Sequence, residues 1–268
     1  MSDPVPQTLS RLTIYLGVRR FLLLAPSIAV DRAHSPYRRL SASILLACAE
    51  PFQIEAGDVK LSTRAVLVAP KVPRQRLSAI GSDLAIIDLP MHSPECCALD
   101  ALMSAHPVLA LDFERFAPLL PALRRGFAGS LTATELTAFF NDVVVAITGQ
   151  PPAASALDPR VEKAMQLLKD LPLGEANLPA LAARLHLSPS RLRHLFKAET
   201  GNTVSHYARW IAVWRAISLW SQGRSLTDIA HEVGFFDLAH LDHAFMEVFG
   251  LNPSTVIDPR NISLIRYD

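Results

Sequence analysis

Short hydrophobic runs separated by turn residues dominate the first half of this 268-residue chain. Each run has the length and composition of a β-strand, and glycine with aspartate or serine between the runs is typical of turns. The predicted strands are residues 12–18, 20–25, 42–47, 51–55, 64–69 and 83–89. This pattern predicts a small β-barrel or β-sandwich.

The hydrophobic spacing changes to that of helices after Pro94. Residues 113–127 and 131–147 are amphipathic, and Thr132 and Glu135 have the spacing of a capping box. The apolar face of the second segment suits either a dimer seam or packing against the barrel. This face consists of Phe139, Phe140, Val143, Val144 and Ile147.

A proline-rich segment divides the chain near residue 156. Residues 1–156 hold 14 of the 20 prolines. Asp158 followed by Pro159 predicts a helix start, because Asp caps helices and Pro fits their first turn. The second half has helical spacing throughout. We therefore predict an α+β two-domain protein, with a small β-barrel plus helices followed by an all-α domain. The predicted parts are a sensor and dimerisation domain (1–150), a linker (151–157) and a second domain (158–268).

The second half contains an internal repeat. Residues 178–201 align with residues 226–250, with one extra residue in the middle turn of the second copy. The aligned pairs are Ala182 and Ala230, Leu185 and Val233, Leu192 and Leu241, Phe196 and Phe245, and Gly201 and Gly250. In the first copy, Ser188 caps a second helix that Gly201 ends. Each copy is predicted to be a helix-turn-helix unit, whose second helix can enter a DNA major groove.

The second helix of the first unit presents a basic face. No acidic residue lies between Glu175 and Glu199, whereas four Lys or Arg and two His do. A local basic face is what contact with phosphates requires. A solvated helix surface is the alternative interpretation, and the repeat favours DNA over it. The outward residues are Ser190, Arg191, Arg193, His194 and Lys197.

Residues 204–223 lie between the two units and contain all three tryptophans. About eighteen helical residues within this segment span about 27 Å. Such a spacer can place two recognition helices near the roughly 34 Å of one DNA turn. We interpret its aromatic residues as core that braces the two units.

Residues 158–260 resemble the DNA-binding domain of the AraC/XylS family of bacterial transcription regulators. The resemblance lies in LAARLHLSPSRLRHLFKAETG (181–201), WRAISLWSQGRSLTDIAHEVGFFDLAHL (214–241) and FGLNPS (249–254). It implies a cytoplasmic activator or repressor that binds double-stranded DNA, and that contacts RNA polymerase if it is an activator. By position, the resemblance places Ser190, Arg193 and His194 at bases. It places Arg191 and Lys197 near phosphates.

The second unit departs from the pattern of that family. Its equivalent positions are Leu238, Ala239, Asp242 and His243. From residue 225 to 250 there are five acidic residues and no Lys or Arg, and like charge opposes binding to phosphate. We expect the first unit to read bases. The second would supply shape, contacts with thymine methyl groups, or a contact with another protein.

Residues 33–57 and 62–89 resemble the cupin-type sensor domain often joined to this DNA-binding domain. The resemblance implies a small-molecule effector inside the barrel. The first half has only three histidines, His34, His92 and His106, so we expect no metal and no cofactor. Four arginines, Arg38, Arg39, Arg74 and Arg76, either line a pocket for an acidic ligand or protect edge strands from aggregation.

The remaining features concern location and catalysis. Three cysteines (Cys48, Cys96 and Cys97) cannot form a disulfide framework, which favours the reducing cytoplasm. The start of the chain lacks the pattern of a signal peptide, and no apolar run is long enough for a membrane span. No phosphate-binding loop, nucleophile elbow or zinc-protease motif occurs, so we expect no enzyme.

We therefore interpret the chain as a sequence-specific DNA-binding transcription regulator that responds to a small-molecule effector and can form a homodimer. Two alternatives stay open at this point. One is a cupin-type metalloenzyme fused to a helical module. The other is an interaction protein that has lost DNA binding.

Overall fold

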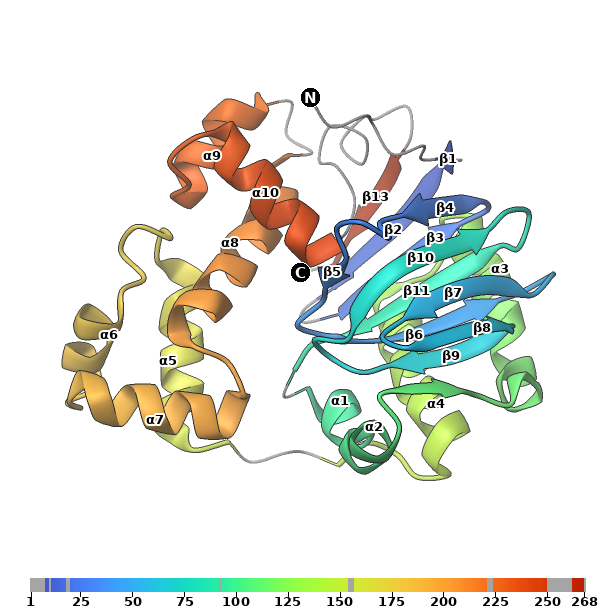
Figure 1. Cartoon of the computed structure of the whole chain (residues 1–268), viewed down its shortest axis with the longest axis horizontal. Helices are drawn as coiled ribbons and strands as arrows, with labels where there is room; N and C mark the ends of the chain where they lie inside the picture. The colour runs from blue at the N-terminus through green and yellow to red at the C-terminus, as the bar shows by residue number, and fades with distance from the viewer. Residues whose placement is uncertain are drawn as a thin grey trace. The chain divides into compact units, whose positions relative to one another are not determined.

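The computed structural model describes residues 8–9, 11–17, 20–91, 93–153, 157–220, 224–249 and 262–267. They form two compact units, Met1–Ser155 with Phe249–Asp268, and Ala156–Val248. The first unit contains strands and helices, and the described part of the second consists of helices (Figure 1). The predicted α+β fold class with two regions of different architecture is confirmed.

Two sheets form the framework of the first unit. The six-stranded sheet has the order β1 (Thr8–Leu9), β4 (Ile28–Asp31), β10 (Pro73–Ala79), β7 (Phe52–Ala56), β8 (Val59–Thr63), with β5 (Tyr37–Arg38) paired to β10. The seven-stranded sheet has the order β12 (Val108–Ala110), β9 (Ala65–Val68), β6 (Ala42–Ala47), β11 (Leu84–Leu89), β3 (Arg20–Ala25), β2 (Leu12–Gly17), β13 (Ile262–Arg266). The described strands thus form two sheets, and of the two predicted forms, barrel or sandwich, the barrel is not closed.

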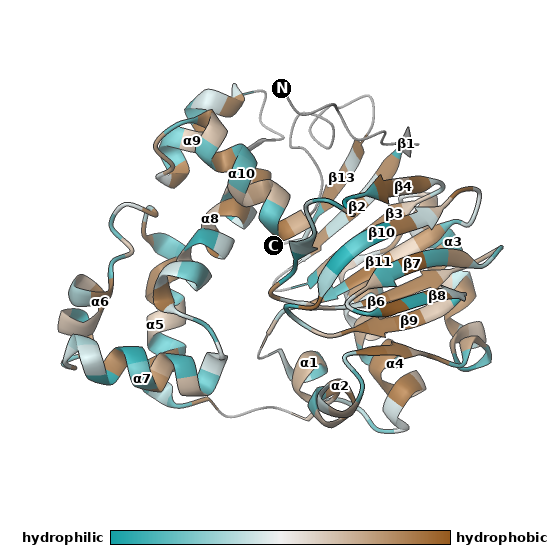
Figure 2. Ribbon diagram, viewed as in Figure 1, coloured by the Kyte–Doolittle hydropathy of each residue, from teal (hydrophilic) through white to brown (hydrophobic). Residues whose placement is uncertain are grey.

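The predicted strands all exist, each within one residue of its predicted ends. Most of the strands that the hydrophobic pattern did not reveal are short or polar, and β10 is largely hydrophilic in Figure 2. By contrast, β6 and β11 are buried along their whole length. A central strand of a covered sheet needs apolar residues on both faces, and that is the pattern that a sequence reveals most clearly.

Five helical segments follow β11 in the described part of the first compact unit, with β12 between the second and the third. These are α1 (Pro94–Cys97), α2 (Asp100–Ala105), the 3₁₀-helix η1 (Phe113–Leu119), α3 (Leu120–Phe127) and α4 (Ala133–Thr148). The predicted helix 113–127 is divided, because Pro118 and Pro121 each lack the N–H that an unbroken α-helix needs. The capping box of Thr132 and Glu135 at the start of α4 is confirmed.

The apolar face of α4 packs inside the first unit. Its five large side chains are at most 8% exposed, and most of them share one hydrophobic core with β3, β6 and β11. The structure therefore decides between the two interpretations of this face. It covers the unit's own sheet, and a dimer seam built from these residues is excluded because they are already buried.

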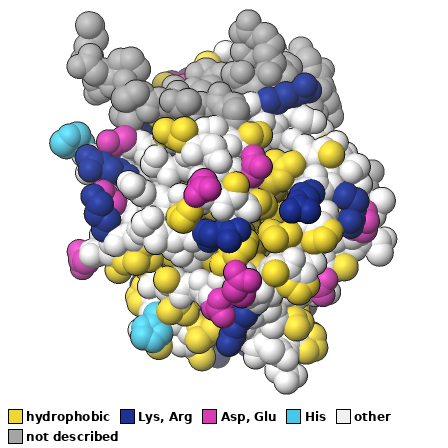
Figure 3. All heavy atoms as spheres, turned by 90° about the vertical axis from the view of Figure 1, so that its right-hand side faces the viewer, with side chains coloured by type: hydrophobic (Ala, Val, Ile, Leu, Met, Phe, Trp, Pro, Cys, Tyr) yellow, Lys and Arg dark blue, Asp and Glu magenta, His cyan; other side chains and the backbone are white. Residues whose placement is uncertain are grey.

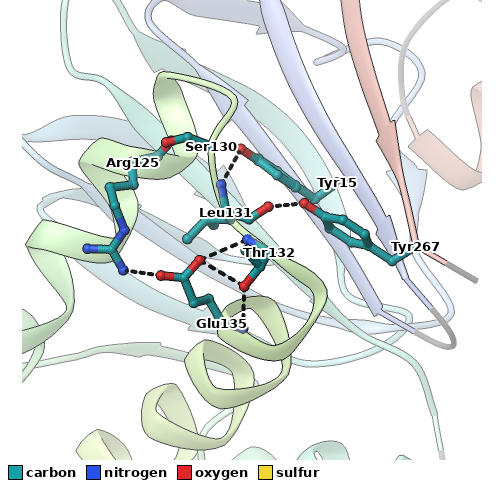
Figure 4. Close-up of polar contacts among 7 residues, drawn as sticks. All are labelled: Tyr15, Arg125, Ser130, Leu131, Thr132, Glu135 and Tyr267. Atoms are coloured by element: carbon teal, nitrogen blue, oxygen red, sulfur yellow. Dashed lines mark hydrogen bonds and ion pairs between the residues drawn. The ribbon is translucent and has the colours of Figure 1, made fainter.

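The end of the chain contributes a strand to the first unit. β13 runs parallel to β2, and Tyr267 stacks on Tyr15 with 6.3 Å between the ring centroids. The Tyr15 hydroxyl donates to the Gly126 carbonyl at 2.9 Å. It also accepts from the Leu131 amide at 3.3 Å, and the Tyr267 hydroxyl donates to the Leu131 carbonyl (Figure 4). Whereas we assigned residues 158–268 to the second domain, this strand is part of the sheet of the first unit.

Six helices make up the described part of the second unit. They are α5 (Pro159–Asp170), α6 (Leu178–Arg184), α7 (Pro189–Thr200), α8 (Val204–Trp220), α9 (Leu226–Val233) and α10 (Leu238–Phe249). Asp158 caps α5 and Pro159 is its first residue, as predicted. Gly223, Gly250 and most of the FGLNPS motif lie outside the described residues. In the described part of the chain, no helix has the length and hydrophobicity that a membrane crossing requires.

Candidate nucleic-acid interface

Helices α6 and α7 form the first predicted helix-turn-helix unit. The Ser188 hydroxyl accepts a hydrogen bond from the Arg191 amide at 3.2 Å and so caps α7, with Pro189 in its first turn. Gly201 ends α7 with a φ of 62°, the left-handed conformation that glycine adopts without strain. Leu192 and Phe196 are fully buried. These contacts fix which side of α7 faces away from the core.

The outward side of α7 carries every residue that we predicted there. Their side chains are exposed, and no described residue makes an ion pair with the basic side chains among them. Their positive charge is therefore available to phosphates, as an electrostatic interface with DNA requires. The exposed residues are Ser190, Arg191, Arg193, His194 and Lys197.

Helices α9 and α10 form the second helix-turn-helix unit, in which a turn again leads into a capped second helix. Asp237 caps α10 by accepting from the His240 amide at 2.7 Å. Gly234 lies in the turn at a φ of 91°, and a Cβ there would lie 2.5 Å from the backbone nitrogen of Leu173. Only glycine fits at this point. The first unit has His186 at the matching position, with a φ of 54°.

The extra residue in the turn of the second unit is Phe236. Its side chain is 84% exposed, directly before the cap of α10. Sequence reasoning noted one additional residue in this turn and did not identify it as a surface feature. The Gly-Phe-Phe sequence (234–236) holds the signal, because the first ring, Phe235, fills the core position beside Val233 and leaves the second without one.

The predicted contact residues of α10 form a different surface from that of α7. Ala239 and His243 are exposed, whereas Leu238 and Asp242 are half-buried. Burial raises the pKa of Asp242. Asp242 stands where the first helix-turn-helix unit has Arg193, so an exposed guanidinium is replaced by a partly desolvated carboxyl group.

Most of the other acidic residues of the second unit have local partners. Glu247 lies 3.5 Å from Arg209 and 3.8 Å from His206, both on α8. Glu232 pairs with Arg224. The Ser225 hydroxyl donates to Asp228 at 2.6 Å. The negative charge is thus largely neutralised by neighbours, but none of these pairs leaves a basic residue free for phosphate.

Helix α8 packs on the first helix-turn-helix unit through aromatic contacts. Tyr207 packs against Phe196 of α7 and against Trp210, and in both pairs the ring centroids are 5.6 Å apart. The ring centroids of Trp210 and Trp214 are 6.0 Å apart. The interpretation of the spacer as a brace of the first unit is confirmed for these rings. The side chain of Trp220 lies outside the described residues.

The histidines and cysteines of the first half do not assemble into a metal site in the described part of the chain. Among the described residues, no three His, Cys, Asp or Glu side chains could hold a metal ion. His92 lies outside the described part of the chain. Burial raises the pKa of Cys48 to about 11 and that of Cys96 to about 12, so both thiols stay protonated at neutral pH.

Comparison with known proteins agrees with this geometry. Residues 181–258 match a family described as a helix-turn-helix domain. The regulator YidL of Escherichia coli K12 is 37% identical over 78 residues, which is 29% of this chain and 26% of that protein. The activator RhaR of Pectobacterium carotovorum is 34% identical over 76 residues, 28% of this chain and 27% of that protein. The chain therefore spans about a quarter of the length of the curated relatives that it matches.

The whole chain has likeness to a solved structure. An apo variant of ToxT from Vibrio cholerae superposes with a TM-score of 0.57 and 13% identity, covering 90% of this chain and 97% of that one. At this identity the likeness shows the fold alone. It extends over both units, whereas the sequence matches are confined to the helices.

The second compact unit, Ala156–Val248, is a helix-turn-helix domain with two copies of the motif. The match at residues 181–258 agrees with the resemblance of residues 158–260 to AraC-type DNA-binding domains. The relatives that share it are named as transcriptional regulators.

Proposed function

We propose that the chain is a sequence-specific DNA-binding transcription regulator whose first compact unit, the one that contains the two sheets, responds to a small-molecule effector. The observation that carries this proposal is the exposed face of α7. Three basic side chains without ion-pair partners project from a helix whose opposite side is fully buried. A rigid helix that presents unpaired cations suits a major groove.

The residues on α7 would have distinct roles. Arg193 would make a bidentate contact to guanine, and Ser190 and His194 would reach neighbouring base edges. Arg191 and Lys197 would bind phosphates and so position the helix without reading sequence.

The second helix-turn-helix unit, α9 and α10, would contribute less to sequence reading than the first. Leu238 and Ala239 suit contacts with thymine methyl groups, because their side chains are apolar and partly or fully exposed. His243 adds charge only when it is protonated, and Asp242 opposes phosphate when it is ionised. Shape and van der Waals contact are therefore the contributions that we assign to α10.

The proposal includes partners and a location. Double-stranded DNA is the main partner, RNA polymerase is a partner if the protein activates transcription, and two copies can bind together as a homodimer. The site of action is the cytoplasm. An effector changes DNA binding only if it binds the DNA-competent state more tightly than the other state, by about 1–3 kcal/mol in typical allosteric proteins.

Selection of bound duplexes from a random-sequence pool by the purified full-length protein tests this function. We expect one enriched sequence block whose recovery falls as salt rises, because phosphate contacts release counterions. Failure to enrich any sequence at any salt concentration would contradict the proposal. It would favour the alternative of an interaction protein that does not bind DNA.

A further inference from the structure

The structure divides the four arginines that the sequence singled out in the first compact unit into two pairs. Arg38 and Arg76 are exposed, and Arg76 pairs with Asp31 at 3.0 Å and with Glu55 at 3.5 Å. Basic and acidic side chains are interspersed on the face of this unit that Figure 3 shows. The other two arginines lie inside. Arg39 is 3% exposed and Arg74 is 4% exposed.

The buried arginines belong to one polar cluster that connects the two sheets. Arg74 comes from β10 of the six-stranded sheet, and Asp88 and Ser43 are paired neighbours on β11 and β6 of the other. Arg39 donates to Asp88 at 3.0 Å. Arg74 donates to the Ser43 hydroxyl at 2.9 Å. The Asp88 oxygen that pairs with Arg39 also accepts from the Ser41 hydroxyl at 2.6 Å.

This cluster carries more positive than negative charge. Arg39 and Arg74 contribute two cations, and Asp88 is the only acidic side chain that the described part of the chain pairs with either of them. Burial and the charge of Arg39 lower the pKa of Arg74 to about 10, so Arg74 is still charged at neutral pH. An uncompensated buried charge is costly unless an anion accompanies it.

Neutral neighbours do not supply that anion. The Phe249 ring, which groups with the first unit, lies 5.5 Å from the Arg39 guanidinium carbon, and Tyr37 interacts with the side chain of Arg74. An aromatic face attracts a cation far less than a carboxylate does. In addition, the Nε atoms of Arg39 and Arg74 are both buried and have no hydrogen-bond partner. Two donors and one positive charge are thus unmatched at the same place.

We infer that the Arg39–Arg74 cluster is the binding site for the carboxylate group of a small-molecule ligand. The inference rests on the proposed function only in making that ligand the effector. A monocarboxylate carries the single negative charge that the cluster lacks. An Nε atom and a terminal nitrogen of one guanidinium form the fork that binds a carboxylate through two hydrogen bonds.

The surroundings favour a carboxylate over a phosphate. A phosphate carries about −1.5 to −2 charges at pH 7, which would leave excess negative charge beside Asp88. Leu45 lies two residues after Ser43 and Ile86 lies two residues before Asp88, so this buried pair is next to the cluster on the same inner face of the antiparallel strands. The polar cluster is therefore followed by apolar surface. The short strand β5, next to Arg39, is the part of the site that reaches the protein surface.

Thermal unfolding of the full-length protein provides the test. Sodium acetate, sodium octanoate and sodium phosphate are each compared with sodium chloride at equal ionic strength, and octan-1-ol serves as the uncharged analogue. We expect a carboxylate to raise the Tm of the wild-type protein in a concentration-dependent manner. A shift with acetate would assign recognition to the carboxylate alone, and a shift with octanoate only would add an apolar tail to the ligand.

Two variants of β10 make the test specific. Arg74→Met keeps the side-chain length and removes the charge, and Arg76→Met does the same at an exposed position on the same strand. We expect at least tenfold weaker carboxylate binding by Arg74→Met, unchanged binding by Arg76→Met and partial retention by Arg74→Lys. Without ligand, Arg74→Met should keep or exceed the wild-type Tm, because an excess buried charge has been removed.

Several outcomes would overturn the inference. These are no Tm shift with either carboxylate, a shift with phosphate alone, an equal shift for octanol, or full carboxylate binding by Arg74→Met. DNA binding is measured separately on the selected duplex. Carboxylate binding that leaves DNA affinity unchanged would support the site and contradict the effector part of the proposed function. DNA binding without any carboxylate response would leave the regulator intact and remove the site.

Discussion

The two helix-turn-helix units share a scaffold and differ in their surfaces. Both have a capped second helix, and both bury a phenylalanine at the same place, Phe196 in one and Phe245 in the other. On the exposed side, Arg193 and Lys197 of the first unit are replaced by Asp242 and Met246 of the second. Folding and the proposed DNA recognition thus rest on separate sets of positions. The internal repeat reports the scaffold, and only the residues between the core positions report function.

Changes to the shared core should have the largest effect and should affect both units. Phe196→Ala and Phe245→Ala each remove a buried ring, which typically costs about 3–5 kcal/mol of unfolding free energy. Urea denaturation followed by circular dichroism measures the loss. A cost below about 1 kcal/mol for either variant would contradict equal burial of the two rings.

Substitution of the aligned charged residues should affect the units unequally. Arg193→Ala should cost about 1–3 kcal/mol on the best DNA site and relax preference at one base pair. Asp242→Ala is the matched control at the equivalent position, and it should leave affinity unchanged or raise it because a carboxyl group near phosphate is removed. Fluorescence anisotropy on the selected duplex measures both. Equal losses for the two variants would mean that both helices read bases.

The phosphate contact assigned to Lys197 predicts a change in salt dependence. Lys197→Ala should weaken binding to all duplexes alike and flatten the slope of log affinity against log salt by about 0.9. Met246→Lys places the same charge at the aligned position of α10 and should steepen that slope. Titrations at several salt concentrations measure the slopes. An effect of Lys197→Ala that varied with sequence would assign Lys197 to bases instead.

The exposed ring in the second turn should have the smallest effect on folding. Phe236→Ser removes a side chain that is 84% exposed, so the free energy of unfolding should change by at most about 0.5 kcal/mol. The same urea denaturation serves as the measurement. A loss several times larger would show that the ring packs against protein, unlike the position before the cap of α7.

The helical compact unit, Ala156–Val248, could be predicted from the sequence more completely than the compact unit that contains the sheets. Its helix starts are set by local chemistry, such as Asp158 with Pro159 and Ser188 with Pro189, and local chemistry is visible in the sequence. The basic face of α7 was visible for the same reason. Its role in DNA binding stays a prediction.

The structure of the compact unit that contains the sheets depends more on contacts between residues that are distant in the sequence. β10 has polar residues along its length and is a strand because β4 and β7 pair with it. β13 is placed by β2, which lies at the other end of the chain. Sequence reasoning grouped four arginines by type, and only the fold separates buried Arg39 and Arg74 from the exposed pair. Pairings of this kind are tertiary and leave no local periodicity.

The central claim is that the first helix-turn-helix unit reads the DNA sequence and the second does not. Selection from a random duplex pool, run in parallel with the wild-type protein, Arg193→Ala and Asp242→Ala, tests it most directly. The account predicts one enriched block, altered at one base pair by Arg193→Ala and unchanged by Asp242→Ala. Two enriched blocks one helical turn apart, with the second altered by Asp242→Ala, would contradict it.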